Sequence, residues 1–220
     1  MEKFSGKMNA LKTTSEDKIE KWSEELQFVI RNSLMNEADG VQDYVDQLRK
    51  LNPGISNEEM VKKIINRRAL KCGGIGAITG MGGILTMPIT MPVDMYHTFK
   101  IQAVLVMAIA YIYGWNIRSE DMITDILLVM GGSSGLNALK NGGIKIGEEF
   151  GKKFIDKFIT REVMKKVNKI ISRKIITKAG EKSLTSFTKL VPLAGAPIGG
   201  GINYFGTMAI GKAAWVFYKG

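Results

Sequence analysis

The feature that most constrains the fold of this chain is a long uncharged segment rich in glycine. It covers residues 72–93, reads CGGIGAITGMGGILTMPITMPV, and contains six glycines and two prolines. A second uncharged segment of the same length, 190–211, also contains six glycines and two prolines. Glycine destabilises a helix by ~1 kcal/mol relative to alanine, so its repetition at helical spacing indicates that two backbones approach closely.

In both segments, glycines recur at steps of three or four residues, which places them on one face of a helix. Such faces let two helices pack backbone against backbone, in membranes and also inside soluble bundles, and the spacing favours neither setting. We therefore expect two closely packed glycine-rich helices. The residues predicted to mediate packing or membrane insertion are Gly73, Gly76, Gly80, Gly83, Gly195 and Gly199.

Two prolines, Pro88 and Pro92, limit the first glycine-rich helix to about 15 residues by this reasoning. At 1.5 Å per residue, such a helix is too short to cross a hydrocarbon layer of ~30 Å. The segment therefore predicts either a half-membrane hairpin or a buried core helix.

Charge and composition narrow the class of partner. The net charge of +10 in 220 residues favours an anionic partner such as phospholipid, whereas nucleic acid is disfavoured because no nucleic-acid-binding motif accompanies the charge. A single cysteine and a single histidine argue against a disulfide, a zinc cluster or another metal site, and we expect no cofactor. The first residues lack the apolar core of a secretory signal, so we expect a cytoplasmic protein.

Most of the excess charge lies in residues 152–178, which contain ten basic and two acidic residues. Apolar residues recur there with a period near 3.6, which predicts an amphipathic helix that lies on an anionic bilayer. The alternative is a helix that packs on the core and exposes a basic face to solvent. The predicted lipid-headgroup contacts are Lys157, Arg161, Lys165, Lys166, Lys169, Arg173 and Lys174.

The N-terminal third is charged and amphipathic. We expect a flexible lead-in over 1–14, two amphipathic helices within 15–55 that meet between Met35 and Gly40, and a helical domain over 56–220. Ser56 and Glu59 form a capping-box pattern that starts a helix running into the first glycine-rich segment. Further helices are expected to begin near Asp94 and after residues 119–121.

Candidate catalytic groups are few. Ser133 lies in a G-x-S-x-G pattern, but the only histidine, His97, precedes it, whereas the hydrolases with this motif have the histidine after the serine. Asp94 and His97 are three residues apart, so the carboxylate could orient the imidazole, but no nucleophile or metal partner is identifiable by spacing, and a helix-capping Asp beside a satisfied histidine is the favoured explanation. We therefore expect no enzyme activity, and a hydrolase using Ser133 or His97 ranks third among the alternatives.

The order of these features resembles the EcsC family over Ser56 to Tyr218. The resemblance rests on ALKCGGIGAITGMGGILTMPITMPVDM and on VNKIISRKIITKAGEKSLTSFTKLVPLAGAPIGGGINYFGTMAIGKAAWVFY, the second stretch being the more specific. It implies a helical fold and little chemistry. Relatives are expected to carry an acidic residue where this chain has Asn203, so a charge-dependent role does not transfer to that site.

Together these patterns predict an all-α helical bundle with two glycine-rich, proline-bounded segments and an amphipathic basic helix. We expect a non-enzymatic protein that associates with anionic membranes at the inner, cytoplasmic face, forms homo-oligomers, and inserts its glycine-rich helices on contact with lipid or an activating protein partner. Its most concrete form is a membrane-permeabilising effector of bacterial defence. The alternative is a soluble helical module that docks on a membrane transporter complex through its N-terminal helices.

Overall fold

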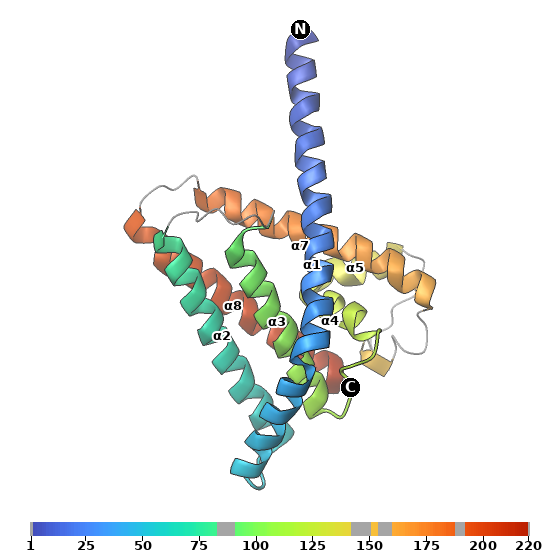
Figure 1. Cartoon of the computed structure of the whole chain (residues 1–220), viewed down its shortest axis with the longest axis vertical. Helices are drawn as coiled ribbons and strands as arrows, with labels where there is room; N and C mark the ends of the chain where they lie inside the picture. The colour runs from blue at the N-terminus through green and yellow to red at the C-terminus, as the bar shows by residue number, and fades with distance from the viewer. Residues whose placement is uncertain (1, 83–90, 142–150, 154–159, 188–191, 220) are drawn as a thin grey trace.

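The computed structural model describes residues 2–82, 91–141, 151–153, 160–187 and 192–219, with side chains placed for most of them. All regular elements that it describes are α-helices, which confirms the predicted all-α fold (Figure 1). In chain order they are α1 (Glu2–Leu51), α2 (Asn57–Gly82), α3 (Val93–Ile112), α4 (Met122–Gly131), α5 (Ser133–Asn141), α7 (Arg161–Phe187) and α8 (Pro192–Lys219).

The centre of the bundle is α3, whose residues are mostly buried between α1 on one side and α2 and α8 on the other. Its core is a continuous apolar run that includes Leu105, Met107 and Ile109, all fully buried. Because α3 is apolar on nearly all sides, it can be stable in water only when it is surrounded by other helices. Helices α1, α2 and α8 provide most of that cover, and α4 also packs on α3.

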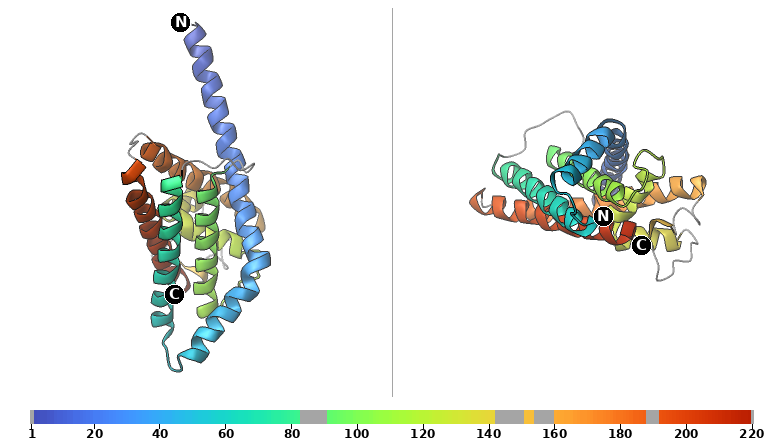
Figure 2. Two further views of the ribbon diagram at one scale, coloured as in Figure 1. Left: turned by 60° about the vertical axis from the view of Figure 1, so that its left-hand side comes forward. Right: turned by 90° about the horizontal axis from the view of Figure 1, so that it is seen from below.

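The first helix differs from the expectation. α1 is one helix of 50 residues, so residues 2–14 belong to it and the expected break before Gly40 is absent. Its buried stripe continues through Ala38, Val41 and Val45, and this continuous core contact outweighs the ~1 kcal/mol penalty of one exposed glycine. The N-terminal part of α1 extends beyond the rest of the bundle in both side views (Figures 1 and 2).

Local signals at the other helix ends are present as predicted. The Ser56 backbone N–H donates to Glu59 Oε2 at 3.0 Å, and the Glu59 N–H donates to Ser56 Oγ at 3.2 Å, which confirms the capping box. Gly54, with φ of +87°, forms the turn after α1, and Gly114, with φ of +83°, ends α3. Asp121 occupies the N-cap position of α4, although its side chain makes no capping hydrogen bond.

The capping-box helix and the first glycine-rich segment form one helix. α2 spans 26 residues, of which the glycine-rich part begins at Cys72. The helix is therefore longer than the expected limit of about 15 residues, because the amphipathic turns before Cys72 are continuous with the glycine-rich part. Gly83, Pro88 and the remainder of 83–90 lie outside the described residues.

Candidate functional site

The two glycine-rich helices lie side by side and antiparallel along their described lengths (Figures 1 and 2). At one end, Lys219 Nζ of α8 contacts Glu58 Oε1 of α2 at 2.6 Å. Farther along the pair, Gly211 faces Ile65, and Gly73 faces Gly200. The helices therefore contact each other from the first turn of α2 into its glycine-rich part.

The contact between α2 and α8 is too close for larger residues at two glycines. A Cβ atom at Gly73 would lie 3.2 Å from the carbonyl oxygen of Gly200 and 3.2 Å from Cβ of Tyr204. A Cβ atom at Gly211 would lie 2.6 Å from Cγ1 of Ile65. These glycines therefore allow close helix packing inside the folded bundle.

The other predicted glycines fall in the same two helices. Gly76 and Gly80 lie in the C-terminal part of α2, and Gly195 and Gly199 lie in the first turns of α8. Gly83 lies outside the described residues. The structure thus places five of the six predicted packing residues in the helix pair, and it describes the surroundings of Gly73 among them.

A row of polar side chains lies where α3 packs against this pair. Asn203 Nδ2 donates to Asp94 Oδ1 at 3.4 Å, and Gln102 Nε2 donates to Thr207 Oγ1 at 3.3 Å. Burial raises the pKa of the Cys72 thiol, which lies beside Thr207. Because buried polar groups need partners, this row fixes the register of α3 against α8.

Asp94 and His97 do not form a catalytic pair. The described partner of the Asp94 carboxylate is Asn203, from α8, and not the histidine three residues away. His97 is exposed and packs edge-on against Tyr96, with ring centroids 5.5 Å apart. Since Asp94 is in the first turn of α3, it also interacts favourably with the positive end of the helix dipole.

Ser133 is not on a nucleophile elbow. The segment before it is helix α4 rather than a strand, and Gly132, with φ of +51°, joins α4 to α5. Ser133 is exposed at the start of α5, and no contact between Ser133 and His97 is seen in the described part of the chain. Among the described residues, no three histidine, cysteine or acidic side chains are arranged as metal ligands.

The basic helix α7 packs on the bundle through its apolar face. Val167, Ile171 and Ile176 are buried, and α7 contacts α1, α4 and α5. The absence of a side chain at Gly131, at the end of α4, allows Ile171 of α7 to pack closely there, because a Cβ atom at Gly131 would lie 2.8 Å from Cγ2 of Ile171. Of the two alternatives for the basic segment, the described part of α7 therefore shows a core-packing helix with a basic outer face.

The outer face of α7 carries most of the predicted headgroup contacts. Arg161, Lys165 and Lys166 are exposed, Lys174 is half-buried, and none of the four forms an ion pair with another described residue. Lys157 lies outside the described residues. Over 161–178 there are seven basic residues and one acidic residue, so this face attracts anions.

The remaining two predicted contacts, Lys169 and Arg173, are held by α1. Lys169 Nζ lies 2.8 Å from Glu20 Oε1, and Arg173 lies 3.2 Å from Glu20 Oε2. The hydrogen bond from Lys169 is the main cause that lowers the pKa of Glu20. The Glu20 carboxylate of α1 is therefore the acceptor shared by these two cations.

Sequence reasoning missed a set of long-range contacts made by one short stretch of α1. Besides Glu20, the Glu25 carboxylate accepts a hydrogen bond from the backbone N–H of Met91 at 2.9 Å, just before α3. Gln27 Nε2 donates to Ser172 Oγ of α7 at 3.1 Å. We call residues 20–27 of α1 the latch, because they join α7 to the start of α3. Nothing in the local sequence pattern indicates these pairs.

A buried ion pair was also missed. Asp125 of α4 is fully buried, and its Oδ2 lies 3.0 Å from Lys152 Nζ. The Tyr218 hydroxyl donates to the same oxygen at 3.4 Å. Both partners are distant from Asp125 in the sequence. The one sequence signal of this ion pair was an acidic residue within an apolar run. The contacts join α4 to α8 and to the residues before α7, so the role is structural.

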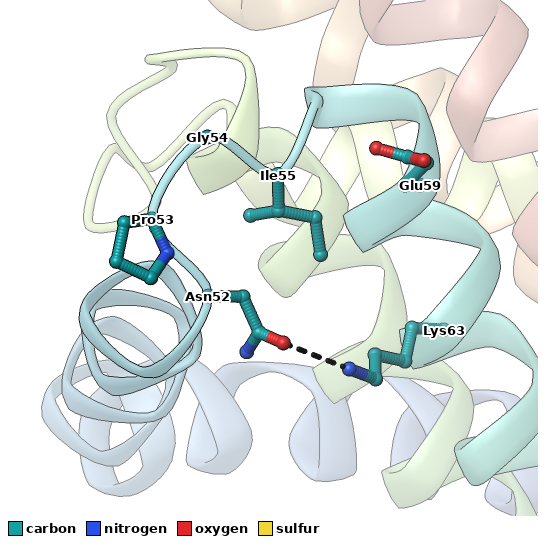
Figure 3. A pocket seen from close by; sticks show the side chains of 6 residues that line it. All are labelled: Asn52, Pro53, Gly54, Ile55, Glu59 and Lys63. Atoms are coloured by element: carbon teal, nitrogen blue, oxygen red, sulfur yellow. Dashed lines mark hydrogen bonds between the residues drawn. The ribbon is translucent and has the colours of Figure 1, made fainter.

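An open hollow lies at the turn between α1 and α2 (Figure 3). It is lined by Asn52, Pro53, Gly54, Ile55, Glu59 and Lys63. Lys63 Nζ donates to Asn52 Oδ1 at 3.3 Å, and Glu59 is engaged in the capping box. The polar groups of the hollow therefore serve the turn, and they form no arrangement of nucleophile and base.

Within the described residues, one helix is long and apolar enough to cross a membrane by length and composition, namely α3. Most of its surface is buried inside the bundle. A buried core helix of a soluble protein meets the same two criteria, so this finding alone does not distinguish a core helix from a membrane span.

These features define a class of protein, an all-α bundle built around an antiparallel pair of glycine-rich helices, with a basic helix exposed on its outside. The family model for the EcsC protein family matches residues 7–220, and the chain therefore belongs to the EcsC protein family. No curated protein and no solved structure shows a significant match to the chain.

Proposed function

We propose that this protein is a non-enzymatic, membrane-associating protein of the cytoplasmic membrane face, and that the outer face of α7 binds anionic phospholipid. One observation carries the proposal: α7 buries its apolar face in the bundle and directs its cations outward. Each cation near an anionic surface contributes about 1 kcal/mol. Arg161, Lys165, Lys166 and Lys178 together then supply about 4 kcal/mol without any change of fold.

The position of α7 supports this orientation. In both side views, α7 runs across the end of the bundle at which α2 ends and both α3 and α8 begin (Figures 1 and 2). A membrane that binds the outer face of α7 therefore lies next to the glycine-rich end of the helix pair. Pairing of a cationic face with nearby apolar helices is typical of proteins that bind a bilayer surface.

Conditional insertion is the second part of the proposal. In the soluble form the glycine faces pack inside the bundle, and the latch holds α7 and the start of α3 in place. Anionic headgroups compete with Glu20 for Lys169 and Arg173, because phosphate is also an acceptor for both cations. Loss of these contacts weakens the hold of α1 on α7, after which the glycine-rich helices insert and form homo-oligomers. An activating protein partner that binds α1 would have the same effect.

The binding step is tested by co-sedimentation with vesicles of phosphatidylglycerol and phosphatidylcholine at low salt. We expect Lys165→Glu/Lys166→Glu to reduce binding by tenfold or more, as estimated from ~1 kcal/mol per charge. The control, Lys50→Glu/Lys63→Glu, makes the same charge change near the turn at the opposite end of the bundle. Absence of wild-type binding, or equal loss in both variants, contradicts the proposal.

The insertion step is tested by release of a dye from the same vesicles, as expected for a membrane-permeabilising effector of bacterial defence. Gly76→Leu/Gly80→Leu should abolish release and leave binding intact, because the substitutions block close packing of helices in an oligomer. Binding without release by the wild-type protein contradicts permeabilisation and leaves the binding step standing.

A second function, docking on a membrane transporter complex, is favoured by the part of α1 that extends beyond the bundle. An extended helix with few neighbours in its own chain is available to pair with another protein. This function predicts that the protein is extracted from cell membranes by salt, that it releases no dye, and that removal of residues 2–14 prevents its recovery with membranes.

A further inference from the structure

The outward face of α8 carries a row of exposed apolar side chains. Its exposed positions in the described part of the helix recur at steps of three and four residues. They are Ile202, Phe205, Ala209, Lys212, Val216 and Lys219. Phe205 and Val216 are 70% and 71% exposed, and Ile202 is 40% exposed. We call Ile202, Phe205, Ala209 and Val216 the α8 stripe.

This row differs from the single apolar residues that are normal on protein surfaces. On α1, the exposed Phe28 and Met35 are separated by the exposed Arg31, and each stands among polar neighbours. On α8, four of six exposed positions are apolar and lie along one line. Ile202, Phe205 and Ala209 are three successive exposed positions with no charge between them, and Val216 follows beyond Lys212. An apolar row of this kind, on a helix otherwise packed in a bundle, marks a surface that another apolar phase covers.

The charges around the α8 stripe indicate what covers it. Lys212 and Lys219 are the two polar members of the exposed row. Trp215, beside the stripe, has Lys62 of α2 and Lys219 each 5.7 Å from its ring centroid. Apolar residues flanked by lysines, with an aromatic ring at the edge, are complementary to the acyl–headgroup boundary of an anionic bilayer.

Chain continuity places the start of α8, and with it the Ile202 end of the stripe, nearest to the cationic helix. α7 ends at Phe187 and α8 begins at Pro192, so the two ends are at most about 18 Å apart. The cationic face of α7 and the α8 stripe with its lysines thus lie on successive helices. Both features favour contact with an anionic bilayer. A partner protein would have to match both features, whereas an anionic bilayer matches them without a specific fold.

We propose that the α8 stripe is a second membrane contact, which enters the acyl–headgroup boundary while the bundle stays folded, with Lys212 directed to the headgroups and Lys219 still paired with Glu58. The inference rests on the proposed membrane association and adds a contact of a different physical kind. The α7 contact is electrostatic and weakens in salt, whereas the α8 contact buries apolar surface and persists.

The test measures binding to vesicles of phosphatidylglycerol and phosphatidylcholine at low salt and at about 1 M salt, where the Debye length falls to ~3 Å. Phe205→Ser/Val216→Ser should weaken the binding that remains at high salt by about tenfold, as expected for loss of two partly buried apolar side chains. The matched control is Phe28→Ser/Met35→Ser, which removes exposed apolar side chains from α1. All four positions are exposed, so the substitutions should leave folding intact.

A second measurement reports the position of α8 directly. In a Trp22→Phe/Trp115→Phe background, Trp215 is the one remaining tryptophan, and vesicles containing brominated acyl chains should quench it when the stripe is in the boundary. Binding that vanishes at high salt, or quenching that is absent from bound protein, overturns the inference and leaves electrostatic binding by α7 standing. Equal loss in the α1 control variant also overturns it. No binding at either salt removes the proposed function itself.

Discussion

Replacement of Gly211 by alanine is the most direct test of the close helix pairing. The change has two opposed effects on the free energy of unfolding. Alanine favours the helical state by ~1 kcal/mol over glycine. Against this, the new Cβ atom would lie 2.6, 3.0 and 3.1 Å from Cγ1, Cδ1 and Cγ2 of Ile65, a buried side chain. Overpacking of this kind costs about 1–3 kcal/mol, and contact with three atoms places it in the upper part of that range. We expect net destabilisation by about 1–2 kcal/mol.

Two further variants separate these effects. Gly206 lies in the same helix, and a Cβ atom there would meet nothing within 4 Å, so Gly206→Ala should stabilise the protein by up to ~1 kcal/mol. Ile65→Ala removes the three opposing atoms at once. In that background Gly211→Ala should change sign and become stabilising, which gives a coupling energy of about 1–3 kcal/mol in the double-mutant cycle.

The assay is urea unfolding followed by circular dichroism, with thermal unfolding as a second measurement. For a chain of this size, 1 kcal/mol corresponds to a shift of roughly 2–4 °C in Tm. If Gly211→Ala stabilises the protein as much as Gly206→Ala does, or if Ile65→Ala does not alter its effect, then α2 and α8 do not approach as closely as described and the reasoning is refuted.

Other predictions concern the latch and the start of α2. Glu20→Gln should lower the fraction of anionic lipid needed for dye release, since it weakens the hold on Lys169; the control Glu24→Gln, an exposed position with the same charge change, should not. Ser56→Ala should destabilise the fold by ~1 kcal/mol through loss of the capping box, as measured by urea unfolding. Hydrogen bonds from the Ser56 backbone N–H and, second, from its hydroxyl lower the pKa of Glu59 below its ordinary 4.5, so this stabilisation is complete above that pH and falls as the pH drops further. Ser56→Ala removes the hydroxyl hydrogen bond and keeps the backbone one, so it should flatten the decline in part.

Helix boundaries set by local chemistry could be predicted from the sequence. The capping box at Ser56 acts within four residues, and Gly54 and Gly114 end their helices through a positive φ that other residues adopt reluctantly. The glycine spacing likewise predicts close packing, because only backbone approach compensates for glycine inside a helix. These signals depend on neighbours in the sequence and are therefore visible in it.

The remaining features depend on which helices meet. Gly40 looks like a break by itself, but the buried stripe of α1 runs past it because α3 covers both sides of that point. Asp94 is at the right spacing for His97, yet Asn203 from α8 is its described partner. The latch residue Glu25 pairs with Met91 across 66 positions. No local periodicity encodes such contacts. The glycine-rich helix faces and the basic helix could therefore be predicted separately, but the contacts by which α1 joins α7 to the start of α3 could not.

The close contact between α2 and α8 indicates that, if insertion occurs, the two helices move together. Their backbones pack around Gly73 and Gly211, whereas the latch holds α7 through a few polar side chains, which anionic lipid displaces in the proposed mechanism. Separation of α2 from α8 would expose both glycine faces, and breaking the latch exposes far less apolar surface. We therefore expect insertion of the pair as a unit.

A disulfide between the two helices tests this expectation. In a Cys72→Ala background, Ile65→Cys/Gly211→Cys places one thiol on each helix at a pair of facing positions, because a Cβ atom at Gly211 would lie 2.6 Å from Cγ1 of Ile65. The oxidised protein and the same protein after reduction should release dye from anionic vesicles to the same extent. The disulfide constrains only the separation of α2 and α8. Release that appears only after reduction would therefore show that the two helices must separate, and their pairing would then be a feature of the soluble form alone.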